Sequence, residues 1–258
     1  MKPRAASTYS QSDFLKPFWT KFVGPAWLVS LGFYALVAAV RFFAFFSPYE
    51  MQHVFFLQTV AMWMLPFLFL TPRGRDEIGL TRGGGTPIAL IGSAFAGAAC
   101  GLILFRVGMA VYGFSQDNWC ISIRNYLHID DMRGILSPAV LFALYAVPAV
   151  CLNPIGEELL FRGFIQQAFS RRFGSIVGTA VSSILSGAIY LYLHGLWRDN
   201  SGFHFRFGSI ALAVGLMFGI GVVFTLCRKF SRSLWAAMVA HAAFNLALLA
   251  CEVIEFAR

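Results

Sequence analysis

Two adjacent carboxylates, Glu157 and Glu158, stand in an otherwise apolar stretch of this chain, and Arg162 follows them. On a helix Glu158 and Arg162 are four residues apart, so they share a face and can form an ion pair. Glu157 is rotated by about 100° from Glu158 and therefore points elsewhere. A carboxylate left unpaired in an apolar site is suited to act as a general base. The spacing therefore predicts a paired Glu158 and an available Glu157.

Two histidines and an asparagine follow further along the chain. His194 comes four residues after Tyr190 at the end of one apolar run, and His241 comes four residues before Asn245 within another. Polar side chains in apolar helices usually face the interior of a bundle, where they mark functional paths or interhelical hydrogen bonds. The pair of His241 and Asn245 therefore indicates a functional helix face.

Purely structural roles are the alternative for these motifs. Asn153 could cap a short helix at the inner surface, with Pro154 in its first turn and both glutamates complementing the helix dipole. His194 stands at the end of a run, where a histidine is more often an interfacial residue than a catalyst. These alternatives stay open on local spacing alone.

Composition places all of these residues in a membrane. The chain is 58% hydrophobic and only 12% charged, whereas soluble proteins carry roughly 25% charged residues. A helix needs about 17–25 mostly apolar residues to cross a bilayer. Runs that reach or approach this length are 22–40, 54–72, 83–105, 134–156, 173–193, 207–227 and 233–251. We predict an all-α fold, a polytopic membrane helical bundle of about seven transmembrane helices.

The chain has too little loop sequence for a second core, so we expect one membrane domain with four parts. These are a basic, mobile cytosolic tail (1–21), accessory helices with an outer loop (22–133), a catalytic core (134–251) and a C-terminal tail (252–258). In the outer loop, Trp119 and Tyr126 suit an interfacial position. Small residues four apart predict close helix packing at Gly97 and Gly101, Gly178 with Ser182 and Ser186, and Gly215 and Gly219.

Charge distribution predicts the orientation. The net charge of +8 would suit nucleic acid binding, but with the N-terminus inside, the inner segments sum to +9 and the outer segments to −1. The inner cations are Lys2, Arg4, Lys16, Lys21, Arg73, Arg75, Arg82, Arg171, Arg172, Arg228, Lys229 and Arg232. By the positive-inside rule we expect a cytosolic N-terminus, an outer C-terminus and no nucleic acid partner.

Depth tests whether the motifs can meet. At about 1.5 Å per residue, Glu157 lies about 21 Å from Arg171, and His241 about 13 Å from Arg232. Asn245 lies about 20 Å from the same boundary, so the three converge near the middle of the membrane.

The same count places His194 about 30 Å from Gly174, nearer the outer surface. Helix tilt and side-chain reach can close its offset of roughly 9 Å from Glu157. Convergence also requires the fourth span to be a kinked helix of about residues 140–170, with both glutamates buried. Pro148 and Pro154 predict the kink.

Together the motifs resemble the CAAX protease and bacteriocin-processing family of intramembrane proteases, often called CPBP or Abi. Its signature is Glu-Glu-x-x-x-Arg, then Phe-x-x-x-His, then His-x-x-x-Asn/Asp/Ser, on separate helices. The chain supplies Glu157-Glu158 to Arg162, Tyr190 to His194 and His241 to Asn245, in that order. The resemblance covers about residues 134–251, and Tyr190 stands where the family usually has Phe.

The resemblance implies an intramembrane endopeptidase with four catalytic residues. Glu157 with His194 would activate a water that attacks the scissile carbonyl, because both groups accept protons. His241 and Asn245 would stabilise the oxyanion, because both can donate hydrogen bonds where charge develops.

The remaining assigned residues support these four. Glu158 and Arg162 would form a structural pair, and Tyr190 and Phe161 would line the pocket. No cofactor is expected. Zinc held by Glu157, His194 and His241 is the alternative, but the chain lacks a His-Glu-x-x-His helix.

The expected substrate is a membrane-anchored or lipidated protein or peptide within the bilayer. The position of His194 favours cleavage in the outer half of the membrane, for instance of a C-terminal sorting helix. We expect a multi-pass protein of the bacterial inner membrane, and the sequence does not indicate its oligomeric state.

Two other classes of function compete with the protease. Intramembrane ionisable residues also mark ion or proton routes in transporters and channels, but no inverted repeat is detectable and the polar groups cluster. A non-catalytic membrane scaffold could retain the same fold and bind other membrane proteins.

Overall fold

Helices dominate the computed structural model, which describes residues 13–47, 52–80, 85–126, 135, 137–192, 195–199 and 202–256. Within these residues, five helices are long and apolar enough to cross a membrane: Ala26–Phe46 (α2), Pro87–Tyr112 (α5), Phe142–Phe173, Phe207–Ser231 (α12) and Leu234–Glu255 of α13 (Leu234–Phe256). Two shorter apolar helices are α3 (Gln52–Phe69) and α11 (Ser175–Ala188). The multi-pass helical membrane fold is confirmed, and crossing by all seven predicted runs stays a prediction.

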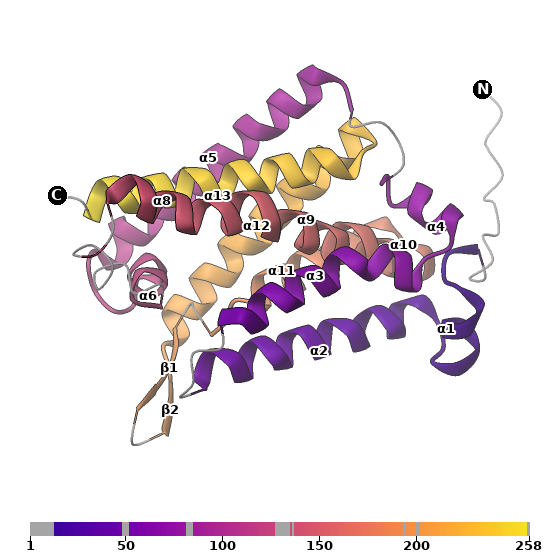
Figure 1. The fold of residues 1–258 in the computed structure, drawn as a ribbon, viewed down its shortest axis with the longest axis horizontal. Helices are drawn as coiled ribbons and strands as arrows, with labels where there is room; N and C mark the ends of the chain where they lie inside the picture. Colours follow the sequence, from indigo (N-terminus) through magenta and orange to yellow (C-terminus); the bar gives the residue numbers. More distant parts are fainter. Residues whose placement is uncertain are drawn as a thin grey trace.

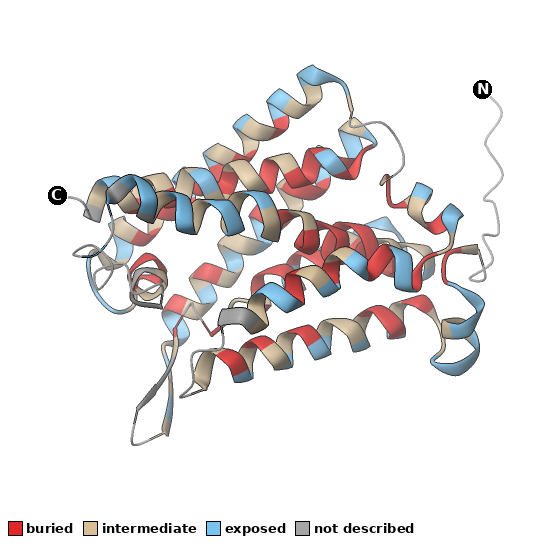
Figure 2. Cartoon of the chain, in the orientation of Figure 1, coloured by how far each residue is buried: buried red, intermediate tan, exposed pale blue. Residues whose placement is uncertain are grey.

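The surface of the bundle fits a lipid environment. Large apolar side chains are widely exposed, including Ile88 (83%), Phe95 (73%) and Phe43 (72%). Buried residues instead gather on the helix in the middle of the bundle, which lies in space between α3 and α13 (Figure 2). Such extensive exposed apolar surface marks contact with a membrane or a partner, and here it covers the length of the candidate spans.

The predicted kinked helix runs as one continuous element through the middle of the bundle (Figure 1). Its parts are α8 (Pro138–Ala146), η2 (Val147–Leu152), α9 (Asn153–Glu158), η3 (Leu159–Ile165) and α10 (Gln166–Phe173), where η2 and η3 are π-helical. Ser137 caps its start, since its Oγ accepts from the Val140 amide at 3.4 Å. The helix therefore passes Gly156, both glutamates are buried within it, and Asn153 is not a helix cap.

Wider helical turns accommodate the two prolines. In η2 the Asn153 amide donates to the Pro148 carbonyl, five residues back. A proline has no amide hydrogen to donate, so a register shift of this kind redistributes the hydrogen bonds around it. The predicted irregularity at Pro148 is thus a π-helical segment.

Close packing at glycines positions α13. A Cβ on Gly97 of α5 would lie 1.8 Å from the Ala240 carbonyl oxygen, and one on Gly101 would lie 2.5 Å from the Phe244 carbonyl oxygen. Gly178 makes a similar approach to Ser170. The prediction for Gly215 and Gly219 is wrong, because no atom of the described residues lies within 4 Å of a Cβ at either position. Those two glycines lie on a face of α12 without such a neighbour, so small residues alone do not identify an interface.

The predicted inner segments gather at one end of the bundle. Arg171 pairs with Glu77 at 2.6 Å, and the Leu234 amide donates to the Gly79 carbonyl at 3.3 Å. Helices α1 (Pro17–Phe22) and α4 (Pro72–Glu77) also lie at this end (Figure 1). The grouping is as expected, whereas the side of the membrane it faces stays a prediction.

Part of the predicted mobile tail is instead built into the fold. Phe14 and Leu15 are fully buried, and Leu15 forms a β-bridge with Leu70. Their apolar side chains join the core cluster around Phe164, which explains why residues 13–22 are held.

The opposite end carries two features that differ from expectation. In α6 (Trp119–Tyr126), Trp119 is fully buried instead of interfacial, because Gly108 of α5 leaves room for its ring. The all-α fold also has an exception, a two-stranded antiparallel hairpin of β1 (Leu196–Asp199) and β2 (Gly202–Phe205). Arg206 and Asp117 pair at 2.9 Å and tie the end of this hairpin to the outer loop.

Candidate active site

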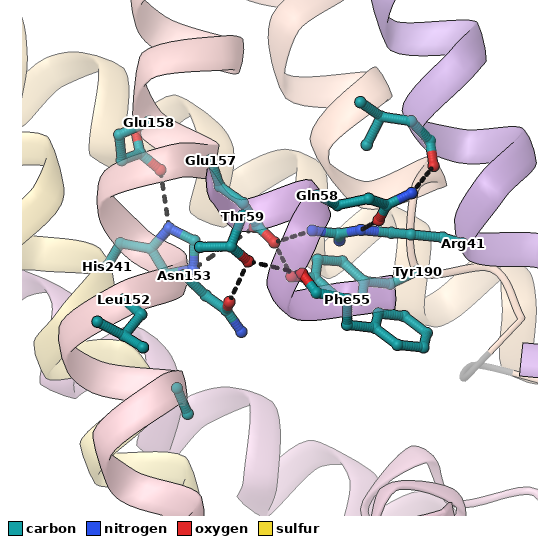
Figure 3. A network of polar contacts seen from close by, with 12 residues as sticks. Arg41, Phe55, Gln58, Thr59, Leu152, Asn153, Glu157, Glu158, Tyr190 and His241 are labelled. Carbon is teal, nitrogen blue, oxygen red and sulfur yellow. Dashed lines mark hydrogen bonds and ion pairs between the residues drawn. The ribbon is translucent and has the colours of Figure 1, made fainter. Parts of the chain in front are cut away.

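Glu157 lies at the centre of a network of buried polar side chains (Figure 3). It is only 2% exposed. Its Oε1 accepts hydrogen bonds from Arg41 Nη2 at 3.0 Å and from the Tyr190 hydroxyl. Its Oε2 lies 3.9 Å from His241 Nε2. One carboxylate oxygen is therefore held by donors from α2 and the turn after α11, while the other faces the imidazole of α13.

The expectation that Glu157 has no charged partner is wrong. Its partner Arg41 is itself buried and lies 116 residues earlier in the chain. A buried carboxylate must be compensated by a cation or by hydrogen bonds, since desolvation of a lone charge costs several kcal/mol. Pattern reasoning about residues 153–172 could not reveal a partner on a distant helix.

Glu158 occupies a second, adjacent environment. It is fully buried, and its Oε1 accepts from Arg162 Nη1 at 3.0 Å and contacts His241 Nδ1 at 2.9 Å. The i to i+4 spacing brings Glu158 and Arg162 together as predicted. Arg162 Nη2 extends the contact to Ser186 Oγ of α11 at 3.4 Å. The pair therefore links the central helix to α11 and α13.

His241 bridges the two carboxylates. Its Nδ1 contacts Glu158 and its Nε2 faces Glu157. Its ring stacks on Phe224 with centroids 5.2 Å apart, and only 7% of the residue is exposed. When Nδ1 donates to the Glu158 carboxylate, the neutral ring presents a lone pair at Nε2, and the protonated ring presents an N–H there. Glu158 thus orients the imidazole toward Glu157.

Arg41 is held in place by Gln58. The Arg41 Nε donates to Gln58 Oε1 at 3.2 Å, and Gln58 Nε2 donates back to the Val37 carbonyl at 2.9 Å. Both residues are buried and both lie in the region that the sequence assigned to accessory helices. The available sequence signal was an arginine at the end of an apolar run, since intramembrane charges are typically functional.

Asn245 donates a hydrogen bond to a backbone carbonyl that has no amide partner within the π-helical segment. Because the Asn153 amide bonds the Pro148 carbonyl, the next carbonyl, Ala149, faces Pro154, which has no amide hydrogen. The Asn245 Nδ2 donates to this carbonyl at 2.6 Å. A side-chain amide carries two N–H groups, so one hydrogen is used structurally and a second is available for another acceptor.

The other predicted site residues differ in placement. Tyr190 contacts Glu157, as described. Phe161 is fully buried in the hydrophobic core, with its ring 6.2 Å from that of Tyr34 and 5.8 Å from the Arg162 guanidinium carbon, and its predicted place in the pocket stays a prediction. His194 lies outside the described residues, so its predicted role as a base stays a prediction.

Charge at Glu157 argues against a metal on the same carboxylate. The Arg41 guanidinium already neutralises it at 3.0 Å, and a nearby divalent cation would be repelled by that charge. In the described part of the chain, no group of three His, Cys, Asp or Glu side chains is placed to hold a metal ion. The predicted zinc set includes His194, so the zinc alternative is not decided by this geometry.

Comparison with known families agrees with the motifs. Residues 131–247 match the family described as Type II CAAX prenyl endopeptidase Rce1-like. This region is Rce1-like. The resemblance inferred from the motifs is confirmed, and the family indicates a protease of the CAAX endopeptidase class. No curated protein and no solved structure matches the chain.

The extent of the match separates two contributions to the site. The Rce1-like region contains Glu157, Glu158 and His241, whereas Arg41 and Gln58 lie outside it. The network of Figure 3 is therefore completed by helices α2 and α3, to which the family match does not extend.

Proposed function

We propose that this protein is an intramembrane endopeptidase that hydrolyses a peptide bond of a membrane-anchored or lipidated protein by means of a water activated at Glu157. The observation that carries the proposal is the buried arrangement of Glu157 Oε2 opposite His241 Nε2, 3.9 Å apart. A carboxylate oxygen and an imidazole nitrogen at this separation can both contact one water molecule.

In this mechanism Glu157 is the general base. It takes a proton from the water as the oxygen attacks the scissile carbonyl carbon, and the carbonyl oxygen becomes an oxyanion. Proton transfer from Glu157 to the leaving amine then completes the cleavage. His194 would assist Glu157 in positioning the water, as the family resemblance implies.

Protonated His241 and Asn245 would stabilise the oxyanion. The contact of Nδ1 with Glu158 at 2.9 Å orients the ring so that Nε2 points into the site, where an Nε2–H can donate to the oxyanion when the ring is protonated. The second N–H of Asn245 is the other candidate donor. Donors fixed in advance and shielded from water stabilise developing charge more than mobile ones do.

Arg41 and Arg162 would have positioning roles. Arg41 holds Oε1 of Glu157 and thereby leaves Oε2 directed to the reaction space. Arg162 holds Glu158, which in turn orients His241. Neutralisation of Glu157 by Arg41 supports a metal-free glutamate mechanism over a zinc mechanism.

The proposed substrate is a protein anchored in the bilayer, entering from the surrounding lipid. Prenylated C-terminal segments fit the family description, and a C-terminal sorting helix fits the predicted position of His194 toward the outer face. We place the protein in the bacterial inner membrane with a cytosolic N-terminus, on the charge distribution of its segments.

Cleavage by reconstituted protein tests the proposal. Purified protein in liposomes is incubated with a prenylated CAAX peptide and with a reporter anchored by a C-terminal helix, and products are identified by mass spectrometry. Glu157→Gln should lower turnover by about 10²–10⁴-fold, the usual contribution of general base catalysis. Its amide oxygen can still accept hydrogen bonds from Arg41 and Tyr190, so the contacts of this oxygen are kept.

A matched control changes a glutamate outside the network, Glu255→Gln near the end of α13. This control should cleave at the wild-type rate. Equal cleavage by Glu157→Gln would exclude Glu157 as the base, and a folded wild-type protein that cleaves neither substrate would favour a scaffold.

A further inference from the structure

A second polar cavity lies at the predicted inner end of the bundle, away from Glu157. It has a volume of about 310 Å³, at the lower end of the range for small-molecule sites. It is formed where α10, the start of α11 and the end of α12 meet the segment after α4. Its lining residues are Glu77, Gly79, Gln166, Gln167, Ser170, Ser175, Arg228, Lys229 and Arg232.

The lining carries an excess of positive charge. It contains three cations, Arg228, Lys229 and Arg232, and one carboxylate, Glu77. That carboxylate is bound by a further cation, since both of its oxygens accept from Arg171 Nη1, at 2.6 and 2.7 Å. The cavity is therefore suited to an anion.

Arg228 forms the fixed wall of the cavity. It is only 9% exposed, although it carries a full charge. Its guanidinium donates to the carbonyl oxygens of Ile78 and Glu77, both at 3.2 Å, and to Gln166 Oε1 at 3.4 Å. These contacts hold the guanidinium in one orientation, so little conformational entropy is lost when an anion binds.

Hydroxyl groups and a helix start complete the polar wall. Lys229 Nζ reaches over the start of α11 and donates to Ser175 Oγ at 3.0 Å. The 14-residue α11 begins at Ser175 without a side-chain cap, so its first amides and the positive end of its dipole lie beside the cations. Together with Arg228 this arrangement favours a phosphate, which accepts several hydrogen bonds at once.

Exposed apolar residues adjacent in sequence to two lining residues indicate the source of the phosphate. Ile176 next to Ser175 is 86% exposed, and Phe230 next to Lys229 is 83% exposed. A free phosphate would make no favourable contact with these apolar side chains, whereas acyl chains would pack against them. We propose that this cavity, which we call the inner basic pocket, binds the phosphate of an anionic lipid headgroup while the acyl chains lie against the adjacent apolar side chains.

The test compares two variants with equal loss of charge. Lys229→Gln/Arg232→Gln removes the two exposed cations of the pocket, and Lys21→Gln/Arg172→Gln removes two cations outside the pocket lining at the same end. Detergent-purified proteins are titrated with phosphatidylglycerol or phosphatidylcholine, and bound lipid is counted by native mass spectrometry. Turnover is not measured, so failure here is independent of the proposed protease activity.

We expect the wild type and the Lys21/Arg172 variant to bind one phosphatidylglycerol with similar affinity and to prefer it over phosphatidylcholine. The pocket variant should bind it about 30-fold more weakly, since each cation near the membrane surface contributes about a fivefold factor. Equal weakening in both variants, or no preference in the wild type, would overturn the proposal.

A soluble arm distinguishes the source of the phosphate. Inorganic phosphate and glycerol 3-phosphate are titrated into the same proteins. Tight binding of either anion by the wild type, lost in the pocket variant while lipid binding is unchanged, would overturn the lipid assignment.

Discussion

The two neighbouring glutamates occupy environments of contrasting origin. Glu158 pairs with Arg162 one helical turn away, and its oxygen contacts His241. Glu157 pairs with Arg41 from a helix 116 residues earlier and receives the Tyr190 hydroxyl. One carboxylate is neutralised by its own helix, and the other by the tertiary fold.

The difference explains why each carboxylate is suited to a different task. The Glu158–Arg162 pair joins residues one turn apart on the same helix and does not need α2, so Glu158 can anchor the imidazole. The Glu157 pair depends on the packing of α2 against the central helix, and its second oxygen remains directed to His241. Local pairing therefore serves structure, and long-range pairing prepares the proposed base.

The largest stability effect is expected on the Glu158 side. Arg162→Met would leave Glu158 buried next to His241 without its cation. Breaking a buried pair by removing one partner costs about 3–5 kcal/mol. Reversible unfolding in mixed micelles measures this cost, with the exposed Arg172→Met of the same helix as control. A cost no larger than that of the control would contradict the anchoring role.

Asn245→Ala tests whether one side chain contributes both to turnover and to the stability of the fold. Loss of an oxyanion donor lowers turnover by about 10²–10³-fold, while loss of the Ala149 contact costs about 1–3 kcal/mol of stability because a buried carbonyl is left unsatisfied. Turnover and unfolding are measured on the same preparations. A destabilised variant with wild-type turnover would restrict Asn245 to its structural contact.

Arg41→Lys tests whether Glu157 needs the geometry of the guanidinium or only its positive charge. The charge is retained, but a lysine cannot hold Gln58 and Glu157 together as the planar guanidinium does. Misplacement of the base should lower kcat by about 10–100-fold with little change in KM. The steady-state kinetics of cleavage provide the measurement. Unchanged kcat would mean that charge alone, and not position, matters at Glu157.

The smallest effect concerns the packing that sets the depth of His241. Gly97→Ala would place a methyl group against the Ala240 carbonyl and push α5 away from α13. Overpacking of this kind costs about 1–3 kcal/mol. Gly92→Ala in the same helix is the control, since no neighbour in the described part of the chain lies within 4 Å of its Cβ. Equal midpoints of unfolding for the two variants would contradict a close α5–α13 contact.

Much of the fold and part of the site were predictable from the residues. Long apolar runs predicted the membrane helices, because a bilayer imposes both their length and their composition. The spacing of Glu158 and Arg162 predicted their contact, and depth counting predicted the approach of Glu157 to His241. These inferences succeed because helix geometry is periodic and depends only on nearby residues.

Tertiary structure alone decided the rest. The choice of Arg41 and Gln58 as partners of the base, the burial of Phe14 and Trp119, and the different behaviour of Gly97 and Gly215 depend on which helices become neighbours. A linear pattern reports which face of a helix is small or polar but not what that face meets. The sequence therefore determined the types of residue that can do the chemistry, and the packing of the helices determined their charge partners.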